Sequence, residues 1–293
     1  MTTRELSSAP SMLPIYLKAV APALPGLGML PGVRRGGDEL PDLEIARNGV
    51  TADLERLTSY AEVCGFTVRD AIPVTYPHIL AFPLQMALMT DGSFPFPPMG
   101  MVHVANRITQ HRPIRSTETL DLRVRAADLR PHPKGRQFGV VSEARVGDEL
   151  VWRDVSTYLR RGGGGEGAQQ GAQRAANDVP EGATTWRLPG DLGRRYAGVS
   201  GDHNPIHLYG LTAKAFGFRR AIAHGMWSKA RCVAALESRL PDAVDVEVEF
   251  KKPVLLPSTV AFGSRAGDGE VEFGLRNVEK GTVHLVGHAV SIR

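Results

Sequence analysis

The chain repeats itself on either side of a glycine-rich segment. Residues 162–182 read GGGGEGAQQGAQRAANDVPEG and hold almost no large apolar side chains, so we expect a flexible linker there. SYAEVCGF at 59–66 corresponds to RYAGVSGD at 195–202. HRPI at 111–114 corresponds to KKPV at 251–254, at nearly the same offset. These matches predict a unit that occurs twice in the chain.

Each half shows the same order of signals: a short helix, a longer apolar helix and a run of strands. In the second half, apolar residues recur at helical spacing over 225–240, until Pro241 ends the helix. Alternating or β-branched segments predict strands at 243–250, 258–266, 270–278 and 282–292, and in the first half at 118–129, 136–147 and 149–159. This order indicates an α+β fold, a double hot-dog, in which each curved antiparallel sheet wraps one central helix and the two sheets join edge to edge.

The repeat sets the expected domain boundaries. They are an N-terminal arm at 1–42, a first repeat at 43–161, the linker at 162–182 and a second repeat at 183–293. The arm contains an apolar stretch at 12–32, but Lys18 and four prolines interrupt it, so we do not expect a membrane span. Ala19, Val20 and Ala21 imitate a signal cleavage site, but the stretch before them is short and holds Lys18, so we favour a cytoplasmic protein.

Charge and cysteine content exclude several classes of protein. The formal net charge is only +4, and the basic residues occur as scattered pairs, so the sequence does not favour a nucleic-acid partner. Cys64 and Cys232 are far apart and form no CxxC motif, which argues against a disulfide framework and a structural zinc site.

Polar residues gather in YAGVSGDHNPIHLYG, residues 196–210. Asn204 suits a helix N-cap and Pro205 suits the first helical position, so we expect a helix that begins just after Asp202 and ends near Gly217. Asp202 would then lie on the loop that enters the helix, with His207 in its first turn. A carboxylate and an imidazole held together form a candidate acid–base pair, able to move a proton from a carbon and another onto a departing hydroxyl.

A second motif, AIAHGMW at 221–227, places a glycine at the start of the central helix. The N–H groups near Gly225 would polarise a thioester carbonyl and stabilise the enolate-like charge that forms when its C2 proton leaves.

Plainer interpretations exist for each residue alone. Asp202 and Asn204 would also suit a turn and a cap, and His207 a packed helix face. His203 and His207 are four residues apart, as in some metal sites, but no further ligand has suitable spacing, so we expect no metal. The joint pattern G-D-x-N-P-x-H favours catalysis.

Together, YAGVSGDHNPIH and AFGFRRAIAHGM resemble the signature of the MaoC-like, R-specific enoyl thioester hydratases (hydratase 2), which include actinobacterial 3-hydroxyacyl-thioester dehydratases. Residues 43–293 are similar to their two-hot-dog members. The resemblance implies that Asp202 and His207 are the catalytic pair, that Asn204 orients them and that the Gly225 amide binds the thioester oxygen. One departure is Tyr209-Gly210, where relatives often carry an acidic residue, so the pocket wall is in doubt there.

We also expect residues near both central helices to contact substrate. They are Tyr196, His224 and Met226 in the second repeat, and Phe82 and Met86 in the first. The first repeat has Phe66 where the second has Asp202, and no N-P-x-H follows, so it cannot perform the same proton chemistry.

The central helix of the first repeat is unusual because it contains Pro77 and Pro83, which we expect to loosen it. Its large apolar side chains would suit a groove for an acyl tail, and the alternative is a plain core. They are Ile79, Leu80, Phe82, Leu84, Met86, Leu88 and Met89.

The sequence therefore predicts a cytoplasmic lyase of fatty acid metabolism that interconverts (3R)-3-hydroxyacyl and trans-2-enoyl thioesters without a cofactor. The carrier would be coenzyme A or acyl carrier protein, and a homodimer is left open. Two alternatives are a hot-dog acyl-thioesterase and a non-catalytic acyl-CoA-binding module. Which of Asp202 and His207 acts as acid or base also stays open.

Overall fold

The computed structural model describes residues 1–12, 14–16, 38–98, 100–162, 179–180, 182 and 184–292. Almost all of the predicted linker and much of the N-terminal arm lie outside the described residues. The chain forms two compact units, one of residues 1–51, 77–103 and 119–171, the other of residues 52–76, 104–118 and 172–293. The repeat boundaries expected from the sequence stay a prediction.

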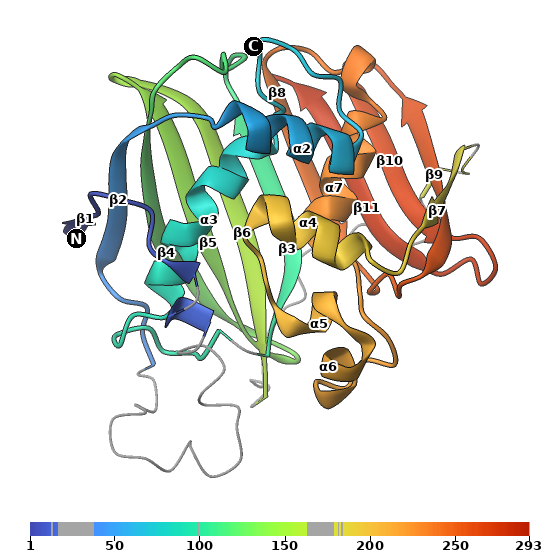
Figure 1. The fold of residues 1–293 in the computed structure, drawn as a ribbon, viewed down its shortest axis with the longest axis horizontal. Helices are drawn as coiled ribbons and strands as arrows, with labels where there is room; N and C mark the ends of the chain where they lie inside the picture. Colours follow the sequence, from blue (N-terminus) through green and yellow to red (C-terminus); the bar gives the residue numbers. More distant parts are fainter. Residues whose placement is uncertain are drawn as a thin grey trace. The chain divides into compact units, whose positions relative to one another are not determined.

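The first unit is a curved sheet with one helix across it (Figure 1). Its strands are β1 (Thr2–Glu5), β2 (Leu43–Val50), β4 (Leu120–His132), β5 (Gly135–Val146) and β6 (Glu149–Arg161), and they lie in this order in the sheet. All neighbours are antiparallel except β1 and β2. Buried side chains alternate along the first half of β4, which explains why this segment forms a strand with one face in the core.

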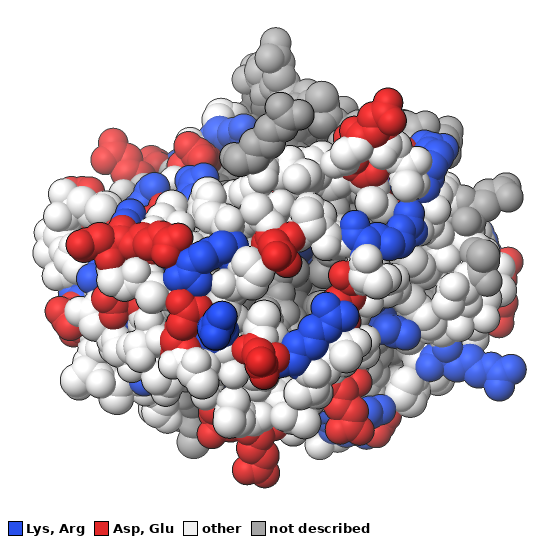
Figure 2. Space-filling view, turned by 90° about the horizontal axis from the view of Figure 1, so that it is seen from above, with Lys and Arg blue, Asp and Glu red and all other residues white. Residues whose placement is uncertain are grey.

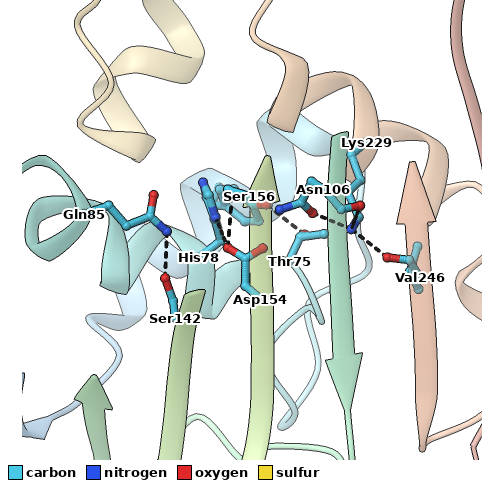
Figure 3. A network of polar contacts seen from close by, with 10 residues as sticks. Thr75, His78, Gln85, Asn106, Ser142, Asp154, Ser156, Lys229 and Val246 are labelled. Atoms are coloured by element: carbon cyan, nitrogen blue, oxygen red, sulfur yellow. Dashed lines mark hydrogen bonds and ion pairs between the residues drawn. The ribbon is translucent and has the colours of Figure 1, made fainter. Parts of the chain in front are cut away.

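Helix α3 (Tyr76–Met89) supplies the core of this unit through residues 77–89. Pro83 lies inside the helix and Pro77 in its first turn, and the helix continues through both. The seven large apolar side chains noted above are all buried. Polar groups accompany them: His78 Nδ1 lies 2.6 Å from Asp154 Oδ2, and Gln85 donates to Ser142 Oγ at 2.9 Å (Figure 3). A groove for an acyl tail here stays a prediction.

The second unit repeats the plan with more helices. Its sheet runs in the order β3 (Met101–Gln110), β8 (Val244–Phe250), β11 (Val283–Ser291), β10 (Glu270–Asn277), β9 (Ser258–Ala266) and β7 (Thr184–Leu188). Its helices are α2 (Leu54–Cys64), α4 (Leu192–Ser200), α5 (Pro205–Leu208), α6 (Gly210–Ala215) and α7 (Gly225–Ala234), and α7 lies across the sheet (Figure 1). Residues 105–110 of β3 pair antiparallel with residues 244–249 of β8, which joins a first-repeat strand to a second-repeat strand. The architecture is α+β and a double hot-dog, as predicted.

The internal repeat is visible in local geometry. Helices α2 and α4 both end at a left-handed glycine, Gly65 (φ 82°) and Gly201 (φ 77°), whose N–H groups bond to the carbonyls of Ala61 and Ala197. Such a cap favours glycine because a side chain is strained at positive φ. The HRPI and KKPV segments also correspond in their hydrogen bonds. Ile114 O accepts from Ile72 N, and Val254 O accepts from Ala223 N, each at 2.9 Å.

Two expected helices differ from the structure. The helix expected to reach Gly217 breaks at Tyr209, whose extended backbone (φ −140°, ψ 147°) separates α5 from α6. Arg194 contacts the chain at this break: its guanidinium donates to Leu208 O at 3.0 Å and lies 5.1 Å from the Tyr209 ring centre. The helix expected at 225–240 ends as an α-helix at Ala234, and a 3-10 turn over Glu237–Arg239 follows.

A fully buried lysine joins α7 to the paired strands β3 and β8. Lys229 Nζ lies 2.5 Å from Asn106 Oδ1, 2.8 Å from Val246 O and 3.3 Å from Asn106 O (Figure 3). A buried ammonium is tolerated when its protons have acceptors, and here three oxygens surround it. The lysine therefore fixes the helix on the two strands.

The described part of the face seen in Figure 2 shows no large field of one charge. Basic and acidic side chains are interspersed on the face seen in Figure 2, in keeping with the small net charge of +4. Among the described residues, no helix has the length and hydropathy needed to cross a bilayer.

We expect Lys229→Met to lower the free energy of unfolding by about 2–4 kcal/mol, because the variant leaves buried oxygens without their charged donor. Urea denaturation measures the change. Lys214→Met is the matched control, since Lys214 is exposed on α6, and it should leave the stability nearly unchanged. Equal stabilities of the two variants would contradict this account.

Candidate functional site

The loop between α4 and α5 holds Asp202 in place. Gly201 ends α4 in a left-handed conformation and turns the chain towards Asp202. Asp202 N donates to Ser200 Oγ at 3.1 Å, and Asp202 Oδ1 accepts a hydrogen bond from Asn204 N at 3.1 Å. Asn204 is the N-cap of α5, as predicted, and its Oδ1 accepts from Ile206 N at 3.4 Å. The loop thus fixes both the Asp202 backbone and one carboxylate oxygen.

His207 lies in the single turn of α5. Its Nδ1 is 2.8 Å from Ile222 O, and because a carbonyl only accepts, Nδ1 carries the proton. The lone pair of the neutral ring is then on Nε2. Helix α4 packs so closely on α5 that a Cβ on Gly193 would overlap the His207 carbonyl oxygen. This contact, which the sequence did not reveal, fixes the His207 backbone.

His224 completes the cluster. Its Nε2 lies 3.0 Å from Asp202 O and 3.8 Å from Asp202 Oδ2. Its ring stacks on His207 with centroids 3.7 Å apart and an interplanar angle of 26°. The centroids of the Tyr196 and His224 rings lie 4.9 Å apart. The other nitrogen, Nδ1, is buried and has no hydrogen-bond partner among the described residues.

The structure brings the predicted pair together. The nitrogen and oxygen atoms that Asp202, His207 and His224 offer all lie within 4.8 Å of one another. The Asp202 side chain is 26% exposed, whereas His207 and His224 are 8% and 2% exposed. Solvent therefore reaches this cluster from the carboxylate side.

Gly225 is the first residue of α7, directly after the N-cap His224. The first N–H groups of an α-helix have no acceptor within the helix, and the helix dipole makes them partly positive. A Cβ on Gly225 would come within 3.1–3.3 Å of three Phe250 ring atoms, so the ring covers one side of this glycine. Met226 follows and is buried. Phe250, which the sequence analysis missed, lies at the end of β8, next to the KKPV match.

The two substrate-contact residues expected in the first repeat, Phe82 and Met86, lie on α3 in the first unit and are buried. Their contact with an acyl chain stays a prediction.

Burial keeps both imidazoles of the cluster neutral. Burial lowers the pKa of His207, and the Asp202 carboxylate and the Ile222 carbonyl oppose this effect. Burial and the neighbouring His207 lower the pKa of His224 to about 3, against an opposing effect of Asp202. At neutral pH the site therefore presents one imidazole with an available lone pair, on His207, beside a second neutral imidazole.

Two imidazoles and a carboxylate are also groups that zinc accepts. The lone pairs of an imidazole lie in the ring plane, and the two rings are nearly parallel, so one ion could bind both only after a ring turns. The expectation that no metal binds stays a prediction.

We expect the His207 ring to titrate below pH 6.5, because burial disfavours its charged form. The ring carbon-bound protons report this in an NMR titration. The His207→Gln variant identifies the resonance by its loss. A midpoint above pH 6.5 would contradict the electrostatic account.

Comparisons with known proteins show which family the chain resembles. A family model described as MaoC like domain matches residues 173–287. The 3-hydroxyacyl-thioester dehydratase X of Mycobacterium tuberculosis is 40% identical over 277 residues, which cover 94% of this chain and 96% of that protein. The crystal structure of the M. tuberculosis protein HtdX superposes with a TM-score of 0.75 and 38% identity, covering 85% of this chain and 100% of that one.

A second relative matches a shorter part of the chain. The (R)-specific enoyl-CoA hydratase of Rhodospirillum rubrum is 39% identical over 69 residues, which are 22% of this chain and 48% of that protein. The long match to dehydratase X, at 40% identity, is sufficient to assign the family. This chain belongs to the MaoC-like 3-hydroxyacyl-thioester dehydratases.

Proposed function

We propose that the protein is a hydro-lyase that reversibly dehydrates (3R)-3-hydroxyacyl thioesters to trans-2-enoyl thioesters. The observation that carries the proposal is the convergence of Asp202 and His207, within 4.8 Å, beside the amino end of α7. The names of the relatives support the reaction, and that of the R-specific hydratase supports its stereochemistry.

The two side chains take complementary roles in the proton transfers. In dehydration, His207 Nε2 accepts the C2 proton, since its lone pair is available while Nδ1–H is held by Ile222 O. The Asp202 carboxylate holds the C3 hydroxyl. As the C3–O bond breaks, this oxygen takes the proton that His207 removed from C2 and leaves as water, which returns His207 to its neutral form. In hydration the carboxylate orients the attacking water, whose oxygen bonds to C3 while a proton passes to C2. Asn204 contributes by fixing Asp202 Oδ1.

The start of α7 stabilises the charge that develops on the thioester. Removal of the C2 proton places negative charge on the thioester oxygen, and the Gly225 amide would donate to it. One such donor is worth about 3 kcal/mol of the barrier. The Phe250 ring beside Gly225 would exclude water there and strengthen this interaction.

The remaining assignments concern the thioester carrier, the region that receives the acyl tail and the cellular location. We infer coenzyme A or acyl carrier protein as the carrier, with the acyl tail received by the apolar α3 region that includes Phe82 and Met86. Cys64 and Cys232 are unpaired and buried, which supports the cytoplasmic location that we propose.

We expect Asp202→Asn and His207→Ala each to reduce hydration of a short trans-2-enoyl-CoA by ~100-fold or more, because the first removes the carboxylate that orients the water and the second removes the proton-transfer group. Loss of enoyl absorbance measures the rate, and circular dichroism checks the fold. His203→Ala is the matched control: His203 is exposed, and its loss should leave the rate nearly unchanged. Wild-type rates in both site variants would refute the roles, and release of free CoA thiol would indicate a thioesterase.

We also expect Gly193→Ala to reduce kcat by ~10- to 100-fold with little change in KM, because the new methyl group displaces the His207 backbone and small misplacements are costly. Gly198→Ala lies on the same helix, and its Cβ would meet no atom within 4 Å, so it should keep wild-type kcat. Equal kcat in the two variants would show that the α4–α5 contact does not position His207. Steady-state kinetics separates the two parameters.

A further inference from the structure

The His224 side chain contacts both Asp202 and His207, and His224 directly precedes Gly225 at the start of α7. We propose that His224 is a positioning residue whose ring N–H ties the Asp202 peptide to the start of α7, and so keeps the proton-transfer pair in register with the Gly225 amide. The inference rests on the proposed function and assigns His224 a role other than substrate contact.

Packing leaves the His224 ring little freedom. The side chain is 2% exposed, with His207 stacked at 3.7 Å and Tyr196 at 4.9 Å between ring centroids. A ring held in this way directs its Nε2–H along a fixed line. Nε2 lies 3.0 Å from Asp202 O, so this hydrogen bond fixes the position of the Asp202 peptide.

The position of His224 in the chain makes this bond useful. It is the N-cap of α7 and directly precedes Gly225, while Asp202 belongs to the loop after α4. Hydrogen bonds from His207 Nδ1 to Ile222 O and from Ile222 N to Ile206 O also link α5 to the segment before α7, and the His224 bond acts directly on the Asp202 peptide. Reacting groups need alignment within a fraction of an ångström, which a short hydrogen bond from a packed ring supplies.

His224 does not itself suit proton transfer. Its Nε2–H is used by the Asp202 carbonyl, and Nδ1 is buried. The lowered pKa, about 3, means that the ring does not take up a proton at neutral pH. A ring that stays neutral can remain stacked on His207 while His207 accepts a proton.

Two substitutions separate the hydrogen bond from the ring. His224→Phe keeps an aromatic ring in the stack but removes the donor. His224→Gln removes the ring but can place an amide N–H near the former Nε2. We expect His224→Phe to lower kcat ~30- to 100-fold with KM within ~3-fold of wild type, and His224→Gln to recover most of kcat.

Ser228→Ala is the control for the helix start. Ser228 is buried on α7 and its Oγ donates to the His224 carbonyl at 3.3 Å, so the variant disturbs the same turn without touching the Asp202 bond. Its kcat should stay within ~2-fold of wild type, since it loses one weak bond. Thermal unfolding of all variants shows whether a rate loss reflects loss of the fold.

The outcomes are distinct. Wild-type kcat in His224→Phe, equal losses in the Phe and Gln variants, or a change confined to KM would each overturn the positioning role. If His224→Phe does not fold, the Gln variant decides: a loss of kcat as large as that of Asp202→Asn overturns the role, and a retained kcat supports it. Absence of hydration by the wild-type protein would overturn the proposed function, and this inference with it.

Discussion

The buried ammonium of Lys229 is the constraint on which the second unit depends. Its three oxygen partners belong to β3 and β8, so they gather around it only when these strands pair and α7 lies over them. Desolvating an ammonium without acceptors would be prohibitive, which penalises other placements of the helix. Lys229 lies four residues after Gly225 and thus on the same helix face. The interaction that fixes the helix on the strands therefore also orients its first turn.

The two repeats differ at the position of the proposed catalytic carboxylate. Phe66 occupies the position of Asp202, and it is buried and stacked with Tyr60 where the second repeat exposes a carboxylate. Helix α2 of the first repeat packs in the second unit: Arg56 Nε donates to Val199 O at 2.7 Å, and Trp227 Nε1 donates to Val63 O at 3.0 Å. Helix α2 of the first repeat thus braces both α4 and α7.

Structural features that depend on residues near one another in the chain could be predicted from the sequence. The Asn204 cap, strands β4 to β6 and β8 to β11, and the grouping of Asp202 with His207 follow from residues a few positions apart. Strands β1, β2, β3 and β7 were not expected from the sequence. Contacts between distant segments were not predictable in this way. Arg194 contacts the chain at the Tyr209 break from α4, and the Phe250 ring reaches Gly225 from strand β8. His224 stood next to a recognised glycine, but its bond to Asp202 O spans 22 residues.

The charge states of the cluster explain why two histidines are stacked there. In the mechanism that we propose, His207 gains a proton during dehydration, and a charged imidazole stacked on another charged imidazole would be strongly disfavoured. His224 avoids this because burial keeps it neutral, with its only directed donor on a backbone carbonyl. The Asp202 carboxylate, on the exposed side, then compensates the transient charge on His207. The arrangement lets one imidazole cycle between charge states while its neighbour holds the geometry unchanged.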